Sequence, residues 1–137
     1  MKSQISFTTD IFESKTPKAH FISPRNFGDD LAGWLVEASR DSGFKLGSPF
    51  QTEGGWTVPA QAGGESFEIG VGIMDESIGD AQANWLITVE KKRKWKVFSS
   101  RDSALRSELC DHIQNILRDK PHIREIRWTD QVGHFAR

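Results

Sequence analysis

The sequence predicts a single α+β domain over residues 1–137, with a curved, mainly antiparallel sheet and two amphipathic helices packed on one face. Three observations lead to this prediction. Two stretches carry apolar residues at helical spacing, the segment between them alternates apolar and polar residues, and its connections are short turns. Because short turns join strands that run in opposite directions, the middle strands should pair antiparallel.

The N-terminal segment is predicted to be extended. Apolar side chains at Ile5, Phe7 and Ile11 alternate with polar ones, which is the period of a half-buried strand. Residues 19–23 read as a second short extended run, since Pro24 disfavours the helical conformation for the residue before it.

The first helix is predicted over residues 27–41. Asn26 or Gly28 can cap it, and Asp29 and Asp30 place negative charge in its first turn, where backbone N–H groups are exposed. Its apolar stripe consists of Phe27, Leu31, Trp34, Leu35 and Ala38. Ser42-Gly43 should end it, because glycine tolerates the conformation that closes helices.

The middle of the chain is predicted to form strands, although residues 47–64 are rich in turn-forming residues. A loop at 61–64 should join two strands as a hairpin, and residues 75–80 should form a turn. The predicted strands cover residues 44–46, 56–60, 66–74, 84–90 and 95–98.

The second helix is predicted to begin at Ser99 or Ser100 and to end before Pro121, which cannot continue a helix. Its buried stripe consists of Leu105, Leu109, Ile113, Ile116 and Leu117. A closing strand follows at 123–129, and the pattern leaves open whether its Ile126 face or its Ile123 face is buried.

Composition restricts the function classes. The formal net charge of −1 provides no overall attraction to nucleic acid or to an anionic membrane. The single cysteine, Cys110, excludes an intramolecular disulfide and fits a reducing compartment. Without a signal peptide or a membrane-spanning apolar stretch, a cytoplasmic location is expected.

No metal or cofactor is expected from the residue spacing. The four histidines, His20, His112, His122 and His134, include no pair at the spacing of ligands on one helix face. Cys110 and His112 are two residues apart on a predicted helix and therefore point about 200° apart, so they cannot form a nucleophile and base. Cys110 is interpreted as a small core or boundary residue.

Two glycines suggest a binding surface. Gly70 and Gly72 lie within a strand pattern and lack the sequence context of a nucleotide-binding loop. Bare backbone on one sheet face permits strong curvature or the approach of another chain, so this face is a candidate groove.

A basic run gives a second candidate surface. Lys92, Arg93 and Lys94 precede Trp95, an aromatic ring that could stack on a base. The alternative is a solvated basic turn, which the neutral overall charge favours over nucleic-acid binding. Trp56 lies near a predicted loop and is a further candidate, because a partly exposed tryptophan often anchors an interface.

Several segments together resemble a group of small bacterial proteins of unassigned function. The resemblance rests on Asp30-Leu31-Ala32-Gly33-Trp34-Leu35, Ser42-Gly43-Phe44, Gly54-Gly55-Trp56 and Ile123-Arg124-Glu125-Ile126-Arg127-Trp128. It implies a bacterial cytosolic origin and brings no catalytic residue.

These observations favour a non-catalytic binding domain with a protein partner, or a homodimer, because no nucleophile, acid–base pair or metal cluster is evident. The alternative is a small hydrolase-like enzyme whose site assembles from distant residues: Glu53, Glu68, Asp75 and His20. Weak nucleic-acid binding through residues 91–96 is a third hypothesis.

Overall fold

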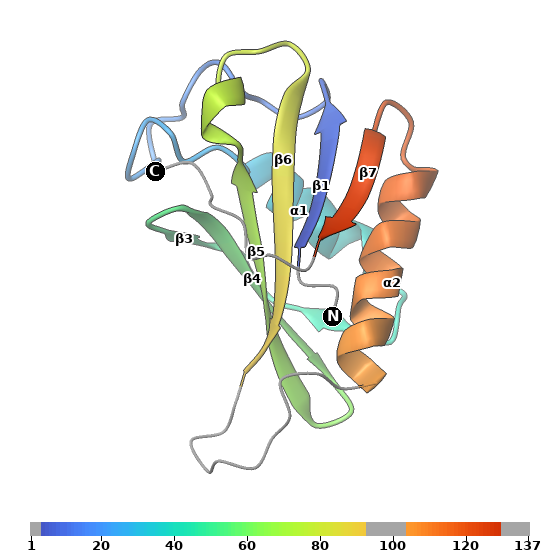
Figure 1. The fold of residues 1–137 in the computed structure, drawn as a ribbon. Helices are drawn as coiled ribbons and strands as arrows, with labels where there is room; N and C mark the ends of the chain where they lie inside the picture. Colours follow the sequence, from blue (N-terminus) through green and yellow to red (C-terminus); the bar gives the residue numbers. More distant parts are fainter. Residues whose placement is uncertain (1–3, 93–103, 130–137) are drawn as a thin grey trace.

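The computed structural model describes residues 4–92 and 104–129 (Figure 1). Its elements along the chain are β1 (Gln4–Thr9), α1 (Asp29–Ala38), β2 (Lys45–Leu46), β3 (Phe50–Thr52), β4 (Gly55–Ala62), β5 (Glu65–Ile73), the 3₁₀ helix η1 (Asp75–Ser77), β6 (Ala83–Lys91), α2 (Ala104–Asp119) and β7 (Arg124–Thr129).

The strands form one seven-stranded sheet in which every pairing is antiparallel. The strand order is β2-β4-β5-β6-β1-β7, and β3 also pairs with β4. In the middle of the sheet, Ile87 lies opposite both Ile5 and Val71. The apolar positions of neighbouring strands therefore share one face.

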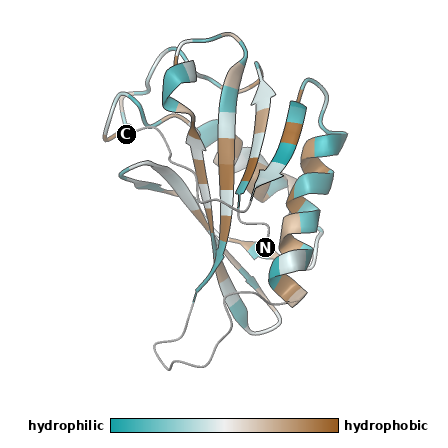
Figure 2. Ribbon diagram, viewed as in Figure 1, coloured by the Kyte–Doolittle hydropathy of each residue, from teal (hydrophilic) through white to brown (hydrophobic). Residues whose placement is uncertain are grey.

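Both helices cover that face, which confirms the predicted α+β architecture. Leu31 and Leu35 of α1 join the same core as Leu109 and Ile113 of α2, and all four are at most 1% exposed. Figure 2 shows hydrophilic residues dominating the visible outer side of α2. The core therefore lies between the sheet and the two helices.

The predicted hairpin between β4 and β5 is present, with Gly63 and Gly64 as its two-residue turn. Both glycines have positive φ, +55° and +78°. Two consecutive positive φ values are typical of the turn type that matches the twist of a hairpin, and glycine adopts them without steric cost. The turn fixes the register of β4 against β5, so that Ala62 faces Glu65.

The first helix is shorter than predicted. It begins at Asp29 after the N-cap Gly28 and ends at Ala38, with Ser39 as its C-cap. Ala38, expected in the buried stripe, is exposed, whereas Ala32 is fully buried.

The prediction of an extended run at 19–23 is wrong, and a strand at Phe50–Thr52 was missed. The two segments meet through Gln51, whose side chain accepts the Ile22 N–H at 2.8 Å and donates to the His20 carbonyl at 2.8 Å. A side-chain amide thus satisfies backbone groups that a strand partner would otherwise bind.

The closing strand turns its Ile126 face toward the core and buries it in part, and Ile123, just before the strand, also packs there. Ile126 and Trp128 pack against the core, and the Trp128 indole donates to Gln114 of α2 at 2.7 Å. A register shift against β1 accompanies the positive φ of Glu125, +57°, which is typical of a β-bulge.

Helix α2 carries a buried cation that the apolar pattern did not predict. Arg106 is 4% exposed, and its guanidinium donates twice to the Val89 carbonyl of β6, at 3.1 and 2.7 Å. These bonds attach the start of α2 to the sheet. The predicted helix start at Ser99 or Ser100 and the predicted strand at 95–98 lie outside the described residues.

Candidate functional site

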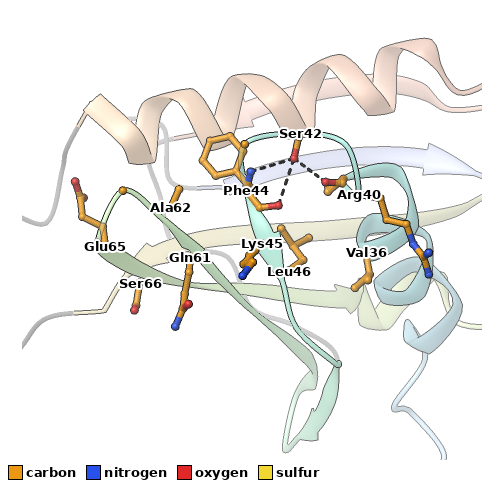
Figure 3. Close-up of a pocket in the computed structure, with 14 residues that line it drawn as sticks. Val36, Arg40, Ser42, Phe44, Lys45, Leu46, Gln61, Ala62, Glu65 and Ser66 are labelled. Carbon is orange, nitrogen blue, oxygen red and sulfur yellow. Dashed lines mark hydrogen bonds between the residues drawn. The ribbon is translucent and has the colours of Figure 1, made fainter.

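A groove of about 880 Å³ opens beside the short strand β2. Three segments line it: the end of α1, the chain leading into β2, and the β4–β5 hairpin (Figure 3). The groove is defined by Val36, Ser39, Arg40, Ser42, Gly43, Phe44, Lys45, Leu46, Gln61, Ala62, Gly63, Gly64, Glu65 and Ser66.

Hydrogen bonds at Ser42 shape the wall between α1 and β2. Its hydroxyl donates to the Ser39 carbonyl at 2.7 Å and accepts the Phe44 N–H at 3.2 Å (Figure 3). Serine side chains readily bond nearby backbone, and here the hydroxyl adds a second bond to the Ser39 carbonyl, which also accepts the Ser42 N–H, and gives the Phe44 N–H an acceptor. The wall is therefore built before any ligand arrives.

A contact between Ser39 and His112 of α2 supports the same wall. Ser39 Oγ lies 2.8 Å from Nε2 of His112 on α2, and the Phe44 ring stacks on the imidazole with centroids 5.7 Å apart. Burial lowers the pKa of His112 below its ordinary value of 6.5, so the neutral ring is the form that the fold favours. A neutral imidazole can accept or donate in this contact.

Acid should weaken this wall. Because the pKa of His112 is lower in the folded chain than in the unfolded one, its contribution to stability is present above pH 6.5 and is lost as the pH falls through the folded value. We expect wild type to lose more stability than His112→Gln between about pH 7 and about pH 5, in urea unfolding. The pKa of Asp30 is raised by burial and acts with the opposite sign, so the comparison with the variant isolates His112. Equal losses in the two proteins would contradict this role.

The edge of the sheet is open at β2. Gly47 donates its N–H to the Pro59 carbonyl, which places these two residues at a hydrogen-bonded position of the ladder, although proline has no N–H to donate in return. Because such positions alternate along an antiparallel ladder, the N–H and C=O of Leu46 point away from β4. Within the described part of the chain, neither group forms a hydrogen bond to another residue.

The groove carries an excess of positive charge. Lys45 is exposed and forms no ion pair within residues 4–92 and 104–129. Arg40 pairs with Glu37 at 2.8 Å, but both side chains are mostly exposed. The carboxylate of Glu65 forms an ion pair with Lys91, whose Nζ lies 3.3 Å from its Oε1, although this buried oxygen accepts no hydrogen bond within the described residues.

The sequence-predicted candidates lie elsewhere. Trp56 is 8% exposed, and its indole N–H donates to the Asn26 carbonyl at 2.8 Å, because the segment before α1 covers it. Gly70 and Gly72 lie in the middle of the sheet, opposite Thr88 and Leu86 of β6, on the face away from the helices. None of the three lines the groove.

Most of the basic run lies outside the described residues. Lys92 directly follows β6 and is exposed, and its N–H donates to the carbonyl of Ser66 on β5. Arg93, Lys94 and Trp95 are among the residues that the structure does not describe.

The residues of the enzyme hypothesis are not joined to one another. Among the described residues, no hydrogen bond or ion pair connects any two of Glu53, Glu68, Asp75 and His20. Asp75 instead pairs with Arg25, and His20 lies 3.5 Å from Asp29. Among the described residues, no three His, Cys, Asp or Glu side chains lie together in a way that could hold a metal ion.

Cys110 is 2% exposed and belongs to the core, which confirms its interpretation as a core residue.

The groove beside β2 was not predicted from the sequence. Its one visible signal was the Ser42-Gly43 pair, which was interpreted only as the end of a helix.

Compared with protein-family models, curated proteins and solved structures, the chain matches none of them. Within the described residues, no helix combines the length and apolar character needed to cross a bilayer.

Proposed function

We propose that this chain is a non-catalytic binding domain of a bacterial cytosolic protein and that its groove takes an extended segment of a protein partner. The observation that carries the proposal is the position of the groove at the open edge of β2. A cavity of about 880 Å³ lies within the usual size range of ligand sites.

The open edge favours an extended ligand. An added strand gains affinity from backbone hydrogen bonds and specificity from side chains beside it. Here the N–H and C=O of Leu46 offer one pair of backbone bonds, and the groove-lining side chains on either side offer contacts. The neighbouring strand β3 is less accessible to an added strand, because its residue Gln51 is hydrogen-bonded to the backbone of Ile22 and His20 in the segment before α1.

Two other hollows are smaller. One of about 370 Å³ lies around residues 10–15, and one of about 220 Å³ lies near Thr8 and Glu125. Neither includes an outward-facing backbone pair on β2.

The enzyme alternative finds its best support in Ser39 and His112, whose contact has the length that a nucleophile and base require. Two observations weigh against it. Ser39 is 2% exposed, and within the described chain no carboxylate bonds to His112 to orient the ring. Support for the wall of the groove accounts for this contact with fewer assumptions.

The remaining alternatives have less support. Nucleic-acid binding depends on a run that is mostly outside the described residues, and its first cation, Lys91, already pairs with Glu65. A homodimer formed through the edge of β2 would compete with the partner segment for the same site.

A peptide library tests the proposal. We expect extended hexapeptides to bind the domain, and N-methylation of one residue of a binder to weaken binding about tenfold, because a backbone donor to Leu46 is lost. Gly43→Trp should block the groove, since a side chain at Gly43 meets open space, whereas Asp119→Trp at the exposed end of α2 should not. Equal peptide binding by both variants would reject the groove as the site, and so would a library without binders.

A further inference from the structure

We infer that the partner segment is acidic and that one of its carboxylates lies beside Lys45. This inference rests on the proposed function, since it names the chemistry of the segment that the groove takes. Three observations lead to it: the charge balance of the groove, the position of Lys45 on β2, and the absence of a competing carboxylate.

The charge balance favours an anion. The groove contains two cations, Arg40 and Lys45, and one carboxylate, Glu65. That carboxylate is already engaged, because Glu65 and Lys91 are 26% and 14% exposed and lie within ion-pair distance. Arg40 is likewise paired, with Glu37, so a basic partner would meet one unpaired cation, Lys45, and no unpaired acid.

The position of Lys45 makes it the more important cation. Arg40 is held by Glu37 on the same helix end, whereas Lys45 has no acidic partner within the part of the chain that the structure describes. Lys45 lies opposite Gln61 of β4, a neutral side chain that can donate to or accept from the same ligand.

The ladder geometry fixes a register. Leu46 is the residue whose backbone groups point outward, and Lys45 precedes it in β2. Side chains directly opposite each other in paired strands lie close enough to interact. The acidic residue should therefore be the immediate neighbour of the residue that bonds to Leu46.

A set of matched hexapeptides tests the inference. The peptides carry Glu, Gln or Lys next to the position that N-methylation identifies, and binding is measured at low salt by fluorescence anisotropy. For the wild-type domain we expect the Glu peptide to bind about fivefold more tightly than the Gln peptide and the Lys peptide to bind most weakly, which is the range for an exposed ion pair. Added salt should reduce the difference.

Charge reversal provides the sharper comparison. Lys45→Glu should reverse the order, so that the Lys peptide binds best, whereas Arg118→Glu on the exposed surface of α2 should leave the order unchanged. Because Lys45 is exposed, the variant should keep the wild-type unfolding midpoint, which the same samples can show. Binding without a charge preference, or an order that Lys45→Glu leaves unchanged, would overturn the acidic partner while leaving the proposed function intact. No binding by peptides of any charge would reject both.

Discussion

Gly55→Ala is expected to lower the free energy of unfolding by about 3 kcal/mol or more, because a Cβ at this position overlaps backbone. The added atom would overlap the Val71 carbonyl oxygen and lie 3.3 Å from the Cα of Gly72. Both belong to the neighbouring strand β5, so neither can move without disturbing the centre of the sheet. Equilibrium urea unfolding measures the change.

Gly33→Ala is the matched control. Gly33 lies inside α1, its φ is not positive, and a Cβ there meets nothing within 4 Å. Alanine should stabilise the helix by roughly 0.5–1 kcal/mol, since glycine loses more backbone entropy on folding. A cost below about 1 kcal/mol for Gly55→Ala would contradict the close approach of β4 and β5 at this point.

Trp85→Ala is expected to cost about 3–5 kcal/mol, the range for truncating a large buried aromatic side chain. Trp85 is fully buried, and its ring packs edge-on against Phe12 with centroids 5.8 Å apart. The indole nitrogen is buried without a hydrogen-bond partner among the described residues. Trp85→Phe should therefore cost far less, because it removes an N–H group that gains nothing in the fold.

Trp56→Phe provides the comparison, since the Trp56 indole donates to the carbonyl of Asn26, a residue only 1% exposed. Loss of that donor leaves a buried acceptor unsatisfied, so Trp56→Phe should cost about 1 kcal/mol more than Trp85→Phe. Thermal and urea unfolding of the variants measure the difference. The reverse order of the two costs would show that hydrogen bonding does not distinguish these tryptophans.

The periodic elements were predictable from the sequence because their burial is one-sided. The stripes of Leu31 and Leu35 and of Leu109 and Ile113 have helical spacing, and all four side chains reach the shared core. The hairpin turn was predictable because Gly63 and Gly64 supply the backbone conformation that it requires.

The short and side-chain-bonded segments were not predictable. Strand β3 has three residues, which is too few to establish a period of two, and it lies within the turn-rich stretch 47–64. The misassigned run at 19–23 depends on Gln51, a residue distant in the sequence whose amide bonds replace a strand partner.

The groove could not be predicted because it depends on tertiary contacts. Ser39 and His112 are separated by 73 residues, and no local pattern relates them. The open edge of β2 follows from its pairing with β4, which only the assembled sheet defines. The pattern at Gly70 and Gly72 correctly indicated bare backbone within a strand, and their role in binding stays a prediction.

Amide chemical-shift mapping with the tightest hexapeptide tests the central claim most directly. We expect the largest changes at Leu46 and at groove-lining amides such as Gly43 and Gly64, with little change in β7. Largest changes at Ile126 on the opposite edge of the sheet, or at the exposed Ile22, with Leu46 unaffected, would contradict binding at the open edge of β2.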